Sequence, residues 1–138
     1  MTRRDEASAA SGNPTTDGPR VWGVVLAAGM ATRMGGSKVT RVLEGRPMVE
    51  RVVDAALASR LAGTVVVVGH EADEVRRILH GRPVRVVENP LFAHGLSTSL
   101  HAGLRGIDSD CDAALFLLAD QPFVTTELID RLIDEHVA

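Results

Sequence analysis

The chain has 138 residues, the length of one domain that is large enough to bury its own core. Apolar residues make up 45% and charged residues 24%, as in globular proteins, and a net charge of −3 gives no general attraction to nucleic acid or anionic membranes. The single cysteine, Cys111, excludes an internal disulfide and a cysteine-cluster zinc site. No apolar stretch reaches the length of a membrane span. We therefore expect a cytoplasmic protein with neither a nucleic-acid nor a membrane partner.

The N-terminal segment, residues 1–20, has the composition of a disordered tail. After Met1 it contains no large aliphatic or aromatic side chain and is rich in small, polar and turn-forming residues. Such a segment buries too little apolar surface to offset the entropy lost on ordering. We expect a disordered tail over 1–20 and one folded domain over 21–138.

The first predicted element is the apolar run 21–28, which ends at Gly29. An unbroken apolar run that ends in glycine is typical of a buried parallel strand that delivers a loop to the edge of the sheet. Glycines in this loop let backbone N–H groups approach an anion, and Arg33 and Lys38 add positive charge. The pattern outlines a polyphosphate site; a glycine-rich turn with two solvated cations is the alternative. The spacing matches neither a P-loop nor a dinucleotide-binding fingerprint, so both classes are disfavoured.

Downstream of this loop, short apolar strands alternate with helices. The predicted elements are a helix over 48–57 behind Pro47, a strand over 65–68, a helix over 71–80, a strand over 84–87, a helix over 97–106, a strand over 113–118 and a helix over 125–137. This alternation predicts an α/β fold with a doubly wound, mostly parallel sheet in three α/β/α layers. Such sheets bind ligands beyond the C-terminal ends of their strands. Gly29, Gly95 and Asp120 all follow predicted strands, so one edge of the sheet could assemble them.

Three segments together resemble one enzyme family. Leu26-Ala27-Ala28-Gly29-x-x-x-Arg33-Met34-Gly35-x-x-Lys38 is similar to the signature loop of the MobA-like nucleotidyltransferases of molybdenum cofactor biosynthesis, and the segments 95–104 and 118–122 agree with the family's later motifs in the same order. These enzymes transfer a nucleoside monophosphate from a triphosphate to a phosphorylated acceptor. The resemblance implies a Rossmann-like nucleotidyltransferase domain over 21–138. Ala-Ala-Gly in the loop is similar to the cytidylyltransferase branch, whereas the guanylyltransferase branch usually has Ala-Gly-Gly, so CTP is the expected nucleotide.

The resemblance also implies roles for individual residues. The implied catalytic residues are Arg33, Lys38 and Asp120. The implied nucleotide-binding residues are Leu26, Ala27, Ala28, Gly29, Arg33, Gly35, Lys38, Ser97 and Ser99. Asp120 closes the strand 113–118, where a carboxylate can hold Mg²⁺ on a triphosphate, and a cap for the turn at Pro122 is its alternative. Ser97 and Ser99 begin a predicted helix, so N-capping is the alternative role for them.

The leading hypothesis is transfer of CMP from CTP to the phosphate of a molybdopterin-type cofactor, with pyrophosphate released and a molybdoenzyme or its chaperone as the protein partner. No protein base is required, because a phosphate monoester is already largely ionised near neutral pH. The alternatives are a GTP-dependent guanylyltransferase, a transferase acting on a sugar or alcohol phosphate, and a non-catalytic nucleotide-binding module. Members of the family are longer, so we expect the chain to lack a C-terminal third that carries acceptor contacts and a second acidic metal ligand.

Overall fold

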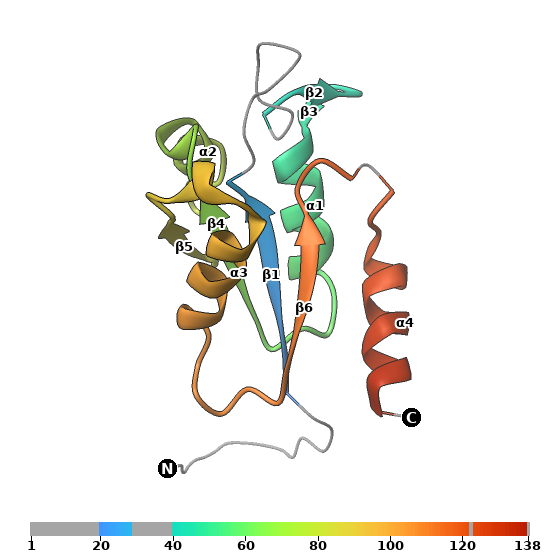
Figure 1. Cartoon of the computed structure of the whole chain (residues 1–138). Coiled ribbons are helices and arrows are strands. Elements are labelled where there is room, and N and C mark those ends of the chain that lie inside the picture. The colour runs from blue at the N-terminus through green and yellow to red at the C-terminus, as the bar shows by residue number, and fades with distance from the viewer. Residues whose placement is uncertain (1–19, 29–39, 122, 138) are drawn as a thin grey trace.

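The computed structural model describes residues 20–28, 40–121 and 123–137. Its central sheet has four parallel strands in the order β5-β4-β1-β6 (Figure 1). The strands are β1 (Val21–Ala27), β4 (Gly63–Val68), β5 (Arg85–Glu88) and β6 (Ala113–Leu118). From β1 the chain builds outward through β4 to β5 and then returns to place β6 on the other side of β1. The order reverses between β1 and β6, and at such a point doubly wound sheets open a crevice for ligands.

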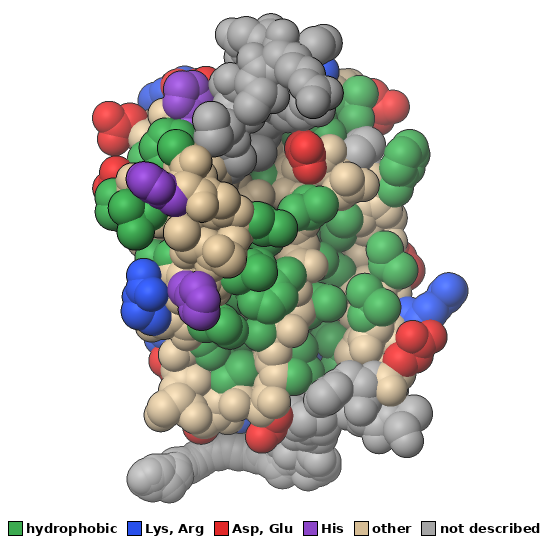
Figure 2. All heavy atoms as spheres, in the orientation of Figure 1, with side chains coloured by type: hydrophobic (Ala, Val, Ile, Leu, Met, Phe, Trp, Pro, Cys, Tyr) green, Lys and Arg blue, Asp and Glu red, His purple; other side chains and the backbone are tan. Residues whose placement is uncertain are grey.

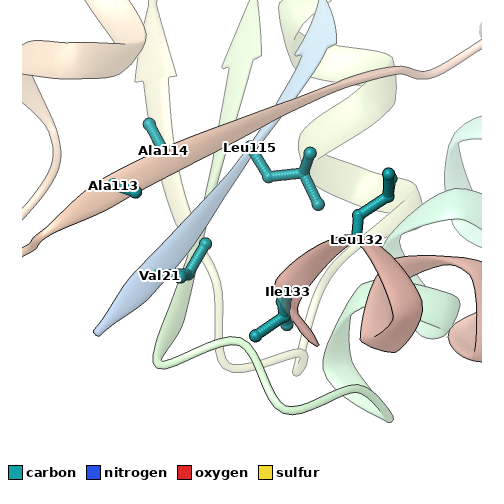
Figure 3. A pocket seen from close by; sticks show the side chains of 6 residues that line it. All are labelled: Val21, Ala113, Ala114, Leu115, Leu132 and Ile133. Atoms are coloured by element: carbon teal, nitrogen blue, oxygen red, sulfur yellow. The ribbon is translucent and has the colours of Figure 1, made fainter. Parts of the chain in front are cut away.

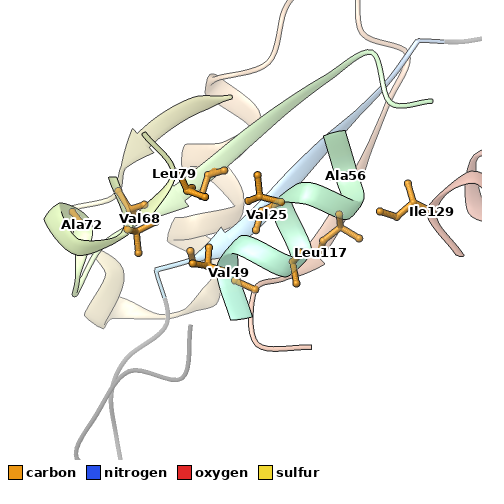
Figure 4. Packing of buried hydrophobic residues seen from close by; sticks show 14 of the residues in the cluster. Val25, Val49, Ala56, Val68, Ala72, Leu79, Leu117 and Ile129 are labelled. Carbon is orange, nitrogen blue, oxygen red and sulfur yellow. The ribbon is translucent and has the colours of Figure 1, made fainter. Parts of the chain in front are cut away.

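Helices cover both faces of the sheet, which confirms the predicted three-layer α/β/α architecture. The helices are α1 (Met48–Leu57), α2 (Ala72–Ile78), α3 (Leu96–Arg105) and α4 (Thr126–Val137). Buried residues of α1, α2 and α4 pack with Val25 and Ala27 of β1 on one face (Figure 4). On the other face, α3 packs with Val24 and Leu26. All seven residues of β1 are buried, because this central strand is covered on both faces. No described helix is both long enough and apolar enough to cross a bilayer.

The observed boundaries lie close to the predicted ones. The helix α1 has its predicted bounds, whereas β4 begins two residues earlier, at Gly63, and α2 is shorter than the predicted 71–80. The structure adds a two-stranded antiparallel hairpin that the sequence did not predict, formed by β2 (Val42–Leu43) and β3 (Arg46–Pro47). Glu44 and Gly45 form its turn with positive φ angles of 54° and 86°, as in the tight turns that suit hairpins.

The N-terminal boundary of the described domain is Arg20. Its backbone N–H donates to Asp112 Oδ2 at 2.6 Å, and its carbonyl accepts from the Asp112 N–H at 2.8 Å, so Arg20 is tied to the start of β6. The rest of the predicted tail, residues 1–19, lies outside the described residues, so its disorder stays a prediction.

Candidate nucleotide site

The C-terminal ends of β1 and β6 lie side by side, as the predicted site requires. Leu26 is in register with Leu118 of β6 and with Val67 of β4, and the Ala119 N–H donates to the Leu26 carbonyl at 3.2 Å. Three of the predicted nucleotide-binding residues end β1 or follow it directly: Leu26, Ala27 and Ala28, with exposed fractions of 8%, 2% and 3%. Because these side chains are buried in the core, the groups they can offer a ligand are those of the backbone.

The predicted phosphate loop falls in residues 29–39, outside the described residues. This segment contains Gly29, Arg33, Gly35 and Lys38, so their assigned roles stay predictions. The residues on either side of it are described. Ala28 leads into it from β1, and Thr40 follows it just before the β2–β3 hairpin.

Asp120 lies at the sheet edge where a metal ligand is predicted. It is half-buried and follows the fully buried Ala119 at the end of β6. Within the described ranges, no hydrogen bond or ion pair engages its carboxylate. The adjoining turn is closed by the backbone, because the Gln121 N–H donates to the Leu118 carbonyl at 3.2 Å. The start of α4 has its own cap, since Thr125 Oγ1 accepts from the Leu128 N–H at 3.1 Å. The capping alternative for Asp120 therefore has no hydrogen bond among these residues to support it.

The segment before α3 is organised by Asn89, a residue that the sequence analysis did not select. Asn89 is 3% exposed, and its Nδ2 donates to Thr98 Oγ1 and to Ser99 Oγ, both at 2.9 Å. Its Oδ1 accepts from the Leu91 N–H at 3.0 Å, and its own N–H donates to the Val68 carbonyl at 2.7 Å. All its side-chain polar groups are satisfied. The backbone of Asn89 is bonded to the end of β4 and its side chain to the start of α3, so this residue ties the two elements together. The sequence feature that could have marked Asn89 is its position directly before Pro90 at the end of a predicted strand.

The two predicted serines occupy different environments at the start of α3. Ser97 is exposed, whereas Ser99 is 5% exposed and its hydroxyl oxygen accepts the hydrogen bond from Asn89 Nδ2. Gly95 precedes them with a φ of 119°, a conformation that favours glycine. The Thr98 hydroxyl donates back to the Gly95 carbonyl at 2.7 Å. This arrangement leaves Ser97 as the serine whose side chain is open to solvent at the helix start.

An apolar hollow of about 190 Å³ lies elsewhere in the molecule. Its lining residues are Val21, Ala113, Ala114, Leu115, Leu132 and Ile133 (Figure 3). Val21 and Ala113 are the first residues of β1 and β6, so the hollow lies at the N-terminal end of the strands, opposite the predicted nucleotide edge. It also lacks a polar side chain that could fix a nucleotide. We therefore do not assign the nucleotide to this hollow.

A group of ion pairs joins α1 to its surroundings outside the predicted site. Arg82 Nε lies 2.7 Å from Asp54 Oδ1, and Arg82 Nη2 lies 2.7 Å from Glu50 Oε2. Arg46 of β3 also pairs with Asp54. The hydrogen bond from Arg82 lowers the pKa of Asp54 below its ordinary value of 3.8 and raises the pKa of Arg82. These contacts fasten α1 to the hairpin and to the segment before β5.

The fold and the loop motifs define a nucleotidyltransferase-type domain, and comparison with known proteins identifies its family. Residues 23–138 match the MobA-like NTP transferase domain, and the chain belongs to this family. It is 40% identical over 117 residues to the bifunctional protein GlmU of Sorangium cellulosum, a match that covers 79% of this chain and 24% of that protein. The chain thus spans about a quarter of the length of this curated relative.

Solved structures show the same fold. A nucleotidyl transferase from Methanothermobacter thermautotroptrophicus (Mth528) aligns with a TM-score of 0.76 and 33% identity, covering 85% of this chain and 58% of the other. Rv0371c from Mycobacterium tuberculosis H37Rv aligns with a TM-score of 0.72 and 26% identity, covering 86% and 60%. A second structure of Rv0371c is a complex with manganese; it aligns at 0.69 and 24% identity, covering 85% and 59%. The predicted family and fold are confirmed. The relative from Sorangium cellulosum is a GlmU protein, so the molybdenum cofactor branch stays a prediction.

Proposed function

We propose that this chain binds a nucleoside triphosphate at the C-terminal edge of β1 and β6 and serves a nucleotidyltransferase reaction. The observation that carries the proposal is the position of Asp120. Its carboxylate follows β6 beside the end of β1, with no partner among the described residues, and the glycine-rich segment with Arg33 and Lys38 follows β1 directly. A triphosphate bound by this chain needs a metal ligand and cationic groups, and Asp120, Arg33 and Lys38 are the residues proposed for these roles.

The proposed chemistry is alignment and charge neutralisation. An oxygen of the acceptor phosphate attacks the α-phosphorus, the bond to the bridging oxygen of the β-phosphate breaks, and pyrophosphate leaves. Lys38 and Arg33 would neutralise the triphosphate, Arg33 with a planar fork suited to two oxygens. Asp120 would hold Mg²⁺, whose chemistry is to stabilise charge on the phosphates. The donor type fits, because Mg²⁺ binds through few carboxylates together with phosphate oxygens. The manganese complex of Rv0371c supports a divalent cation.

The nucleotide and the acceptor are finer proposals. The sequence Ala27-Ala28-Gly29 favours CTP, with GTP as the competing nucleotide. A molybdopterin-type phosphate is the first candidate acceptor, and a molybdoenzyme or its chaperone is the corresponding protein partner. A different phosphorylated acceptor, such as a sugar or alcohol phosphate, is the second candidate. A nucleotide-binding module without turnover is the third alternative.

Calorimetric titration tests the proposed site. We expect the chain to bind CTP, and we expect Asp120→Asn to lower affinity in Mg²⁺ by at least about tenfold while changing affinity in EDTA by less than about twofold. Asp73→Asn is the matched control, because Asp73 is an exposed carboxylate in the first turn of α2. Equal losses in Mg²⁺ and EDTA would assign Asp120 a structural role. Pyrophosphate release with pterin, sugar and alcohol phosphates then separates an enzyme from a binding module.

A further inference from the structure

Two aromatic rings meet at the C-terminal edge of the sheet, beyond the end of β4. The centroids of the His70 and Phe92 rings are 6.0 Å apart, and the ring planes are tilted by 51°. His70 belongs to the turn between β4 and α2, and Phe92 begins the short 3₁₀ helix η1 (Phe92–His94) that precedes α3. The separation lies within the range of favourable aromatic pairs, roughly 4.5–7 Å. The two rings therefore support each other although they come from different segments.

This aromatic pair lies beside the end of β1. A Cβ built on Gly69 would lie 3.1 Å from Ala28 Cβ and 2.8 Å from Phe92 Cβ, so Ala28 and Phe92 both approach the Gly69 backbone closely. Phe92 also packs against the buried cluster that contains Leu26 and Ala28. The pair thus adjoins the edge at which the proposed function places a nucleoside triphosphate.

Hydrogen bonds hold both segments that carry the rings. On the side of His70, the neighbouring Glu71 accepts a hydrogen bond at Oε1 from Thr40 Oγ1, at 2.8 Å. On the side of Phe92, the Phe92 N–H donates to the carbonyl of Asn89 at 3.3 Å, and Asn89 is itself tied to β4 and α3. Rings on segments that are already ordered can bind a flat ligand at a low cost in conformational entropy.

The two rings differ in their exposure. Phe92 is half-buried, whereas His70 is exposed. Among the residues that the structure describes, no hydrogen bond or ion pair engages the His70 ring. An aromatic ring that is supported on one side and open on the other is suited to stack with a nucleobase.

The strand order separates the two ends of a nucleotide at this edge. The strands β4 and β6 flank β1 on opposite sides (Figure 1), so their ends are about 10 Å apart. Asp120 follows β6, whereas His70 follows β4. A nucleotide that lies across the end of β1 with its phosphates beside Asp120 has its base on the side of His70.

We propose that the exposed ring of His70, supported by Phe92, stacks with the base of the bound nucleoside triphosphate. Because every nucleobase has a π face, this contact binds cytosine and guanine alike and contributes affinity rather than a choice between CTP and GTP. The inference rests on the proposed function, since it takes the nucleotide to lie at this edge of the sheet.

The test compares nucleotides with a triphosphate that has no base. CTP, GTP and inorganic tripolyphosphate are each titrated calorimetrically into the full chain in excess Mg²⁺. We expect His70→Ala to lower the affinity for CTP and GTP about tenfold and to change that for tripolyphosphate less than about twofold, because only the contact with the base is lost. His70→Phe keeps an aromatic ring, so its CTP affinity should stay within about twofold of that of the unmodified chain.

A second histidine provides the matched control. His80 is also exposed, but it lies between α2 and β5, where the chain returns to the N-terminal ends of the strands. His80→Ala should leave the affinities for all three ligands unchanged. An equal loss of CTP affinity in His80→Ala and His70→Ala would overturn the stacking role.

Phe92→Leu tests the supporting ring. Leucine keeps an apolar side chain over Gly69 but removes the ring beside His70, so the affinity for CTP should fall about threefold. Unchanged CTP affinity in this variant would contradict the supporting role of Phe92.

The remaining outcomes separate this inference from the proposed function. If His70→Ala leaves CTP affinity unchanged, or weakens CTP and tripolyphosphate equally, the stacking role is overturned and the proposed phosphate site stands. If His70→Phe behaves like His70→Ala, the contact depends on the imidazole nitrogens and stacking is again the wrong description. If the unmodified chain binds none of the three ligands, the proposed function is overturned and this inference with it.

Discussion

The two faces of the sheet differ in how completely helices cover them. On the face that packs against α1, α2 and α4, the core extends across the sheet to β6, where Leu117 is 5% exposed. On the other face, α3 lies over β1, β4 and β5. Phe116 and Leu118 of β6 are in register with Val24 and Leu26, so they point to this second face, and they are 38% and 44% exposed. One strand is therefore covered on one side and exposed on the other.

The composition of β6 makes this difference informative. Residues 113–118 are Ala-Ala-Leu-Phe-Leu-Leu, with no charge, proline or polar residue. Alternation of apolar and polar residues is typical of strands with one solvent-exposed face, whereas β6 carries apolar residues on both faces. Figure 2 shows hydrophobic side chains gathered beside α3, over β6. Within the described residues, this face of β6 exposes apolar side chains that no helix covers.

The largest expected loss of stability comes from a substitution on the face of the sheet that α1, α2 and α4 cover. Ile129 of α4 is fully buried there, and Ile129→Ala should lower the free energy of unfolding by about 3 kcal/mol, because it removes buried methyl groups and leaves a cavity. Leu132→Ala is the matched control, since Leu132 lies on the same helix with an exposed fraction of 37% and should cost about 1 kcal/mol. Urea denaturation measures both. Equal losses of stability for the two variants would contradict the described packing of α4, with Ile129 buried and Leu132 partly exposed.

The second prediction concerns the close packing of α3. A Cβ at Gly103 would lie 2.4 Å from Val24 Cγ1, so Gly103→Ala should force the helix away from β1 and cost about 2 kcal/mol, despite the higher helix propensity of alanine. Leu104→Ala, one residue later and 48% exposed, should cost less than half as much. Thermal unfolding followed by circular dichroism compares the two variants. Stabilisation by Gly103→Ala would contradict the close approach of α3 to the sheet.

A smaller effect on stability is expected at the ion pairs that join α1 to Arg46 and Arg82. The pKa of Asp54 is lowered in the folded state, so its contribution to stability is present above pH 3.8 and is lost as the pH falls through the lower folded-state pKa. Arg82→Gln removes the main cause of this shift. The stability difference between the unmodified protein and Arg82→Gln should therefore be larger near about pH 6 than near about pH 3. A difference that is independent of pH would assign Arg82 a packing role only.

The smallest effect on stability is expected on the exposed side of β6. Phe116→Lys should change the free energy of unfolding by less than about 1 kcal/mol, because the lysine stem can cover the same surface while its ammonium stays in water. The variant should also bind less of a hydrophobic dye and associate less at high concentration. Dye fluorescence and sedimentation velocity measure these changes. A large loss of stability would mean that this face of β6 is covered.

Most of the fold can be predicted from the sequence because the apolar residues of each long element follow the spacing typical of a helix or of a buried strand. The helix α1 has helical spacing from Met48 to Leu57, and the valine run 65–68 is typical of a buried strand. The hairpin β2–β3 cannot be found in this way, since two-residue strands carry no periodic signal. Its turn, at Glu44 and Gly45, is the local feature that marks it.

The candidate site was predictable in part. The motif around Asp120 names a residue that the fold does place beside the end of β1, whereas the roles of Arg33 and Lys38 stay predictions. Asn89 was missed for a physical reason: it acts through hydrogen bonds to other elements. Residue type alone does not reveal such bonds, because asparagine is common on any surface.

The sequence by itself determined the order of strands and helices and the family, because hydrophobic periodicity and the glycine-rich motif are properties of neighbouring residues. The tertiary structure alone decided that β1 lies between β4 and β6, that α3 covers its face without reaching across β6, and that Thr40 meets Glu71. These features join residues far apart in the chain. Their pairing depends on packing the whole sheet and its helices together, and no local spacing encodes it.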